Sequence, residues 1–76
     1  MQRIDFQLDP DRDYVELNQL LKLCGLCDSG GAGKALVASG AVAVDGEPEL
    51  RKTCKIRAGQ SVTLGSVRIH VLAPAP

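Results

Sequence analysis

The spacing of apolar residues changes at Gly40, and this change constrains the possible folds more than any other feature of the chain. Between Leu17 and Gly40, apolar residues recur three and four positions apart, as on the buried face of a helix. After Gly40 they alternate with polar residues, as along a half-buried strand. The helical set is Leu17, Leu20, Leu21 and Cys24, and the alternating set is Val42, Val44, Cys54, Ile56, Val62, Leu64, Val67, Ile69 and Val71. The sequence therefore predicts an α+β fold, with two short packed helices against a small, mostly antiparallel sheet.

The first helix is expected to begin near Asp13 and to end at Gly25. Asp13 and Glu16 have the spacing of a capping box, in which side chains bond the first free N–H groups of a helix. Gly25 fits the position after the C-cap, where the backbone commonly turns left-handed. Local signals therefore predict both ends of this helix.

The second helix is expected over residues 30–39. Ser29 is a suitable N-cap, Gly40 is a suitable stop, and Leu36 and Val37 face the core. Three of the first four residues are glycine, each costing about 1 kcal/mol relative to alanine in a helix, so the first turn needs support from packing. The link at residues 25–28 is short enough for a helix-turn-helix-like pair.

Strands are expected on both sides of the helix pair. Alternating apolar residues at positions 4, 6 and 8 predict a strand over residues 2–8. The dipeptide Asp45-Gly46 predicts a tight hairpin turn, and the C-terminal third continues as strands. We expect residues 1–72 to form a single domain and residues 73–76 to form a disordered tail.

The length of 76 residues limits what the chain can do. A domain of this size has a thin core, which disfavours a deep substrate cavity and hence an enzyme. No apolar run approaches the roughly 20 residues needed to cross a bilayer, and the start does not resemble a signal peptide, so a cytoplasmic location is expected. The only aromatic residues are Phe6 and Tyr14, too few for a row of base-stacking side chains.

The net charge of zero hides an uneven distribution. Residues 1–49 hold nine acids and four bases, whereas residues 50–76 hold five bases and no acid. Such a split is typical of a face that binds a polyanion, although solvated cations on the outside of a sheet would give the same count. The C-terminal cations are Arg51, Lys52, Lys55, Arg57 and Arg68, and Lys22 and Lys34 could join them in space.

The segment 51–57 is predicted to present its charges on one side of a strand. Cys54 and Ile56 would point toward the core, while Lys55 and Arg57 would point to solvent. A basic strand face beside a helix pair can contact phosphates at fixed positions, which favours recognition of structured RNA by its shape.

The glycine-rich run at residues 29–35 is not a nucleotide-binding phosphate loop. Such a loop would need glycine where Asp28 stands and Ser or Thr where Ala35 stands, and it would follow a strand. A helix start with Ser29 as its cap and Lys34 one turn in can still accept a phosphate of a larger polyanion.

Three cysteines and one histidine leave a structural zinc site open as a hypothesis. Cys24, Cys27, Cys54 and His70 have the right number of ligands for tetrahedral zinc. Only one close Cys pair exists, so we favour buried cysteines that behave as small apolar residues. With one histidine and no paired carboxylates, the sequence offers no hydrolytic centre.

An ordered series of residues between Gly25 and Gly46 matches a known pattern. It comprises Gly25, Ser29, Leu36, Val37, Gly40 and the run Val42-Ala43-Val44-Asp45-Gly46, followed by Ala58-Gly59-Gln60-Ser61-Val62. The series resembles the S-four-type RNA-binding domain family, named for a small-subunit ribosomal protein and sharing the αL RNA-binding motif. The resemblance covers about residues 14–64. It implies a helix pair packed on a small twisted sheet that binds structured RNA, often ribosomal or transfer RNA.

The chain departs from the family pattern at three positions. Gly30 stands where a basic residue is usual, Gly33 where alanine is usual, and Asp45 where asparagine is usual. Lys34 can compensate for the missing basic residue. The chain most resembles the small stand-alone bacterial members of the family.

The resemblance and the charge split together select a candidate RNA-binding face. It comprises Ser29, Lys34, Arg51, Lys52, Lys55 and Arg57, with Lys22 as a neighbour. The sequence thus predicts a non-enzymatic, monomeric RNA-binding module without a cofactor, whose partner is structured RNA, on its own or in the ribosome. Two alternatives stay open: a module that docks an acidic protein partner, and a small zinc-stabilised domain.

Overall fold

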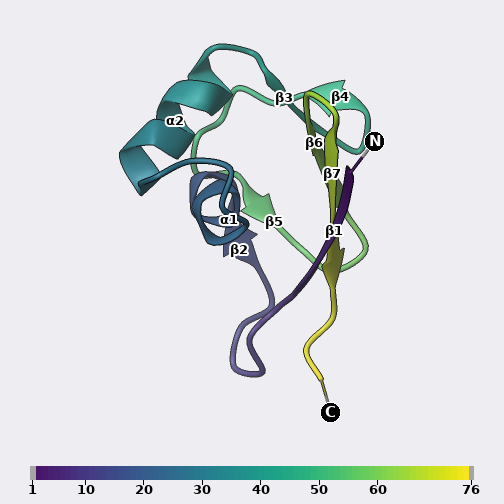
Figure 1. Ribbon diagram of the computed structural model, residues 1–76. Coiled ribbons are helices and arrows are strands. Elements are labelled where there is room, and N and C mark those ends of the chain that lie inside the picture. The colour runs from purple at the N-terminus through teal and green to yellow at the C-terminus, as the bar shows by residue number, and fades with distance from the viewer. Residues whose placement is uncertain (1, 76) are drawn as a thin grey trace.

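The computed structural model describes residues 2–75 as two layers, a helix pair on one side and a sheet on the other (Figure 1). This is the α+β fold that the change of spacing at Gly40 predicts. In chain order the elements are β1 (Gln2–Gln7), β2 (Val15–Glu16), α1 (Leu17–Leu23), α2 (Gly30–Ala38), β3 (Val42–Val44), β4 (Glu47–Pro48), β5 (Lys55–Ile56), β6 (Ser61–Leu64) and β7 (Val67–Leu72).

The main sheet has five strands in the order β1-β7-β6-β3-β4. The β7–β6, β6–β3 and β3–β4 pairs are antiparallel, as expected. The first strand, β1, pairs with β7 in parallel, with Ile4 opposite Ile69. The first and last strands of the chain therefore lie side by side at one edge of the sheet. A separate two-stranded sheet pairs β2 with β5.

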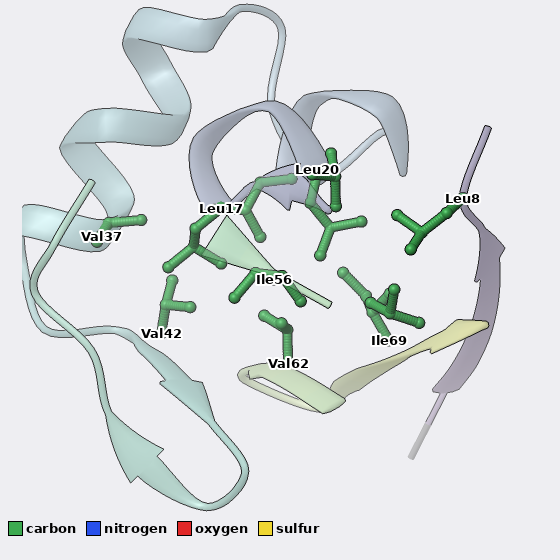
Figure 2. Packing of buried hydrophobic residues seen from close by; sticks show 11 residues of the cluster. Leu8, Leu17, Leu20, Val37, Val42, Ile56, Val62 and Ile69 are labelled. Carbon is green, nitrogen blue, oxygen red and sulfur yellow. The ribbon is translucent and has the colours of Figure 1, made fainter. Parts of the chain in front are cut away.

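The core lies between the two layers (Figure 2). Ile56 of β5 sits between Leu17 of α1 and Val62 of the main sheet, and all three are fully buried. Burying each such side chain contributes about 1.5–3 kcal/mol, so Ile56 helps to hold the short β5 in place. The buried apolar residues are Leu8, Val15, Leu17, Leu20, Leu21, Val37, Val42, Ile56, Val62, Ile69 and Val71.

The start of α1 differs from the prediction. The N-cap is Glu16, which makes no side-chain capping bond, so the capping box expected from Asp13 is wrong. Residues 15–16 are instead extended in β2, and backbone carbonyls replace the side-chain cap. The N–H of Leu17 donates to the Cys54 carbonyl at 2.9 Å, and the N–H of Asn18 donates to the Lys52 carbonyl at 3.1 Å.

The end of α1 agrees with the prediction. Gly25 has a φ of 77° and its N–H donates to the Lys22 carbonyl, while the N–H of Leu26 donates to the Leu21 carbonyl. This is a Schellman motif, which ends the helix and turns the chain toward α2.

The first turn of α2 packs closely on α1. The Ser29 hydroxyl accepts a hydrogen bond from the Ala32 N–H at 3.1 Å, which confirms the expected N-cap. A Cβ added at Gly33 would lie only 2.6 Å from the carbonyl oxygen of Asn18. Glycine therefore lets the two helices approach, and this packing supports a first turn that is intrinsically weak.

The hairpin and the final strands agree with the prediction from the sequence, whereas residues 51–57 do not. Asp45 and Gly46 have φ angles of 51° and 86°, as a tight hairpin turn requires. Within residues 51–57 only Lys55–Ile56 is a strand, so the continuous basic strand is wrong. Residues 52 and 53 form a turn instead, and the carbonyls of Lys52 and Cys54 accept hydrogen bonds from the first N–H groups of α1. The disordered tail at 73–76 stays a prediction, and its last residue lies outside the described part.

Candidate nucleic-acid interface

Most of the predicted cations lie on one segment that runs along the start of α1. We call residues 51–57 the basic segment; it follows β4 and includes β5, which lies beside α1 in Figure 1. The carbonyls of Lys52 and Cys54 accept hydrogen bonds from the backbone N–H groups of α1, and these two bonds fix the position of the segment. The cationic side chains Arg51, Lys52, Lys55 and Arg57 are all exposed.

Asn18 joins the basic segment to the start of α2. Its backbone N–H bonds the carbonyl of Lys52, and a Cβ on Gly30 would lie 3.5 Å from its side-chain nitrogen. The same added Cβ would lie 3.0 Å from the side-chain nitrogen of Gln19. The structure thus brings Gly30 and Lys52 close to Asn18, although Gly30 and Lys52 are far apart in sequence.

The start of α2 offers backbone hydrogen-bond donors close to Asn18. The first N–H groups of a helix have no partner within the helix and carry partial positive charge, which favours a bound anion. Ser29 uses its oxygen to cap the helix, so its hydroxyl hydrogen is the part that can still bond a phosphate. Lys34 is exposed on the second turn of the same helix.

Lys22 takes a different position from the other predicted residues. It lies in the last turn of α1, at the opposite end from the N–H groups that bond the basic segment. A cation there interacts favourably with the negative end of the helix dipole. The hydrogen bonds between the basic segment and the start of α1 therefore do not bring Lys22 close to Lys52.

Arg51 is held by an acidic neighbour that the sequence analysis missed. Its Nε lies 3.0 Å from Glu49 Oε2 and its Nη2 lies 3.0 Å from Oε1, while its backbone N–H donates to the same carboxylate at 3.1 Å. The side-chain and backbone hydrogen bonds from Arg51 lower the pKa of Glu49 to about 2. The Glu-x-Arg spacing was visible in the sequence and is the signal that could have predicted this pair.

Cys54 lies at the base of this pair. Its sulfur is 3.6 Å from Arg51 Nη2 and 3.6 Å from Glu49 Oε1. Partial burial is the main reason that the pKa of the Cys54 thiol is raised, and the negative charge of Glu49 raises it further. The thiol therefore remains protonated at neutral pH and acts as a weak donor to the carboxylate.

Lys55 and Arg57 surround the only tyrosine. Lys55 Nζ lies 4.9 Å from the centre of the Tyr14 ring, and Arg57 Cζ lies 5.8 Å from it. Arg57 also bonds Asp13, with its Nη1 at 3.1 Å from Oδ2. The pairing of β2 with β5 creates this arrangement, and no local sequence signal announces that pairing.

The zinc hypothesis finds no suitable geometry. Within residues 2–75, no three His, Cys, Asp or Glu side chains come together as a metal site would require. The three cysteines are free thiols, each half-buried. In the same part of the chain, no helix has the length and apolar character to cross a membrane.

Comparison with known proteins agrees with this architecture. Residues 7–72 match the S4 domain family. The chain is 48% identical over 60 residues to YbcJ of Escherichia coli and, equally, to YbcJ of Shigella flexneri, covering 79% of this chain and 86% of each relative. The solution structure of E. coli YbcJ, described as revealing an αL motif involved in RNA binding, superposes with a TM-score of 0.70 at 45% identity. That similarity covers 91% of this chain and 86% of the other.

Proposed function

Because the chain belongs to the S4 domain family, we propose that it is a non-enzymatic module that binds structured RNA. The binding region, which we call the basic surface, comprises Ser29, Lys34, Arg51, Lys52, Lys55 and Arg57. We further propose ribosomal or transfer RNA as the partner, a monomer as the active form and the cytoplasm as the location.

One observation carries this proposal: Asn18 contacts both the start of α2, at Gly30 and Gly33, and the carbonyl of Lys52. Backbone donors of the helix and the charged side chains of the basic segment then face solvent at neighbouring, fixed positions. Fixed donors can match the regular spacing of phosphates in a folded RNA, whereas a flexible single strand would have to be ordered on binding. This favours structured RNA.

The cations of the basic surface have different roles in this proposal. Arg51 is oriented by Glu49 and Arg57 by Asp13, so part of the charge of each is already balanced. Lys34, Lys52 and Lys55 have no acidic partner among the ion pairs of the described residues. These three lysines are therefore expected to supply most of the attraction to phosphates.

A charge-reversal pair tests the basic surface. Lys52→Glu with Lys55→Glu should weaken binding to a hairpin RNA by at least about tenfold near 0.1 M salt. The matched control is Arg3→Glu with Arg68→Glu, which changes the net charge equally at two exposed positions paired on β1 and β7. Binding is measured by fluorescence anisotropy, and circular dichroism verifies the fold of both variants.

Two results would reject the proposal. Equal losses in both variants would mean that only the total charge matters. Unchanged affinity in the Lys52 and Lys55 variant would remove the basic surface from RNA binding, and a partner protein retained after nuclease treatment would then favour docking to an acidic protein.

A further inference from the structure

A cavity of about 350 Å³ lies beside the basic surface but is not part of it. It opens between the end of β1, the loop of residues 9–14 and the start of α1; Figure 1 shows this loop in purple below β2. Its lining includes Phe6, Asp9, Arg12, Tyr14, Glu16 and Gln19.

The lining combines aromatic rings with mixed polar groups. Phe6 and Tyr14 are the only aromatic residues in the chain, and both line this one cavity. Asp9 and Glu16 bring acceptors of hydrogen bonds, while Arg12 and Gln19 bring donors. Two carboxylates disfavour a phosphate at this place. An uncharged planar ring with both donors and acceptors fits the lining, and a nucleobase has these properties.

Tyr14 connects the cavity to the basic surface. Its ring lines the cavity and is also approached by Lys55 at 4.9 Å and Arg57 at 5.8 Å. A nucleotide whose base enters the cavity would therefore have its phosphate close to two cations. The cavity could thus bind the base of a nucleotide while Lys55 and Arg57 bind its phosphate.

We propose that the cavity receives one unpaired nucleobase of the RNA held on the basic surface, with a preference for bases that carry an exocyclic amino group. The inference rests on the proposed function and adds a base-reading site to it. The preference follows from Asp9 and Glu16, whose carboxylates accept hydrogen bonds from amino groups. Uracil has no amino group, and its single base donor, the N3–H, can bond only one of the two carboxylates.

The test compares two hairpin RNAs that differ by a single bulged nucleotide. A hairpin with one bulged guanosine should bind about tenfold more tightly than the fully paired hairpin, since stacking on an aromatic ring contributes on this scale. A bulged uridine should recover much less of this gain. With 2-aminopurine at the bulge, its fluorescence should change on binding because the base enters a stacked environment.

Variants separate the cavity from the basic surface. Phe6→Leu and, independently, Arg12→Ala should reduce the advantage of the bulged hairpin while leaving affinity for the paired hairpin nearly unchanged. Arg12 is exposed on a loop, so its replacement should not affect folding. Lys52→Glu should weaken both RNAs by a similar factor and leave their ratio unchanged.

The outcomes distinguish the two proposals. Equal affinity of the bulged and paired hairpins for the unmodified protein would overturn the base site and leave the basic surface standing. If the bulged hairpin keeps its advantage over the paired hairpin in both Arg12→Ala and Phe6→Leu, the bulged base binds elsewhere, and the base site is also overturned. Absence of binding to either RNA would overturn the proposed function, and the base site with it.

Discussion

Asn18 is the residue on which the candidate interface depends. It is 2% exposed, its backbone N–H bonds the Lys52 carbonyl, and its side chain lies against Gly30. Its carbonyl oxygen also limits how close α2 can come, because Gly33 packs directly on it. The backbone of Asn18 thereby helps to fix the relative position of α2 and the basic segment.

Replacing Gly33 should disturb this position. In Gly33→Ala the new Cβ would lie 2.6 Å from the Asn18 carbonyl oxygen, so the helices must separate, and a loss of about 1–3 kcal/mol in the free energy of unfolding is expected. Gly31→Ala is the matched control, because its nearest neighbour would be at 3.8 Å. It should gain up to about 1 kcal/mol from helix propensity. Urea unfolding measures both, and a Gly33→Ala variant as stable as Gly31→Ala would contradict the close packing.

Glu49 should make stability depend on acid. Its pKa falls from an ordinary 4.5 to about 2 in the folded state through the hydrogen bonds from Arg51. The unfolded chain therefore binds the proton more readily, so the contribution is complete above about pH 5 and is lost as the pH falls toward 2. Urea unfolding across this range should show a smaller acid-induced loss in Glu49→Gln than in the unmodified protein. The exposed Asp11→Asn serves as control, and an equal effect of both substitutions would count against the Glu49–Arg51 pair.

At the scale of elements, local signals predicted what depends on local structure. The Ser29 cap, the left-handed turn at Gly25 and the Asp45-Gly46 hairpin each need only a few neighbouring residues, and all three are present. The strand β2 and the parallel pairing of β1 with β7 depend on partners far along the chain. No local pattern carries that information.

The same distinction applies to the candidate site. The charge split and the family resemblance selected the cations, but the sequence could not show that Lys52 and the start of α2 both contact Asn18. The ion pair of Arg57 with Asp13 was missed because it requires the β2–β5 pairing, whereas the pair of Arg51 with Glu49 joins residues only two positions apart.

Removing the cap should weaken α2 as an element. Ser29→Ala deletes the hydroxyl that accepts the Ala32 N–H and should cost about 0.5–2 kcal/mol in the free energy of unfolding. Ser39→Ala removes a serine at the other end of α2, where the hydroxyl bonds the Leu36 carbonyl, and should cost less. Thermal unfolding compares the two, and a larger loss at Ser39 would show that the cap is not the important bond.

At the scale of the whole molecule, zero net charge coexists with a local excess of cations. The attraction to RNA should therefore be short-ranged and sensitive to salt, because the distant acids are screened while the cations contact phosphates directly. The affinity should fall linearly when its logarithm is plotted against the logarithm of the salt concentration.

The slope of that plot identifies which cations contact phosphates. Lys52→Gln should make the slope shallower by about one, as expected for the loss of one phosphate contact. Arg68→Gln, on β7 of the main sheet, should leave the slope unchanged. If both variants or neither changed the slope, Lys52 would not be a distinct phosphate contact.

The most direct test of the central claim is to map the RNA-contacting residues by nuclear magnetic resonance. A hairpin RNA is titrated into ¹⁵N-labelled protein, and the shifts of the backbone amides are followed. The account predicts the largest changes at residues 29–34 and 51–57, with small changes at the hairpin of residues 45–48. Changes centred on the outer strands of the main sheet, with the start of α2 and the basic segment unaffected, would contradict it.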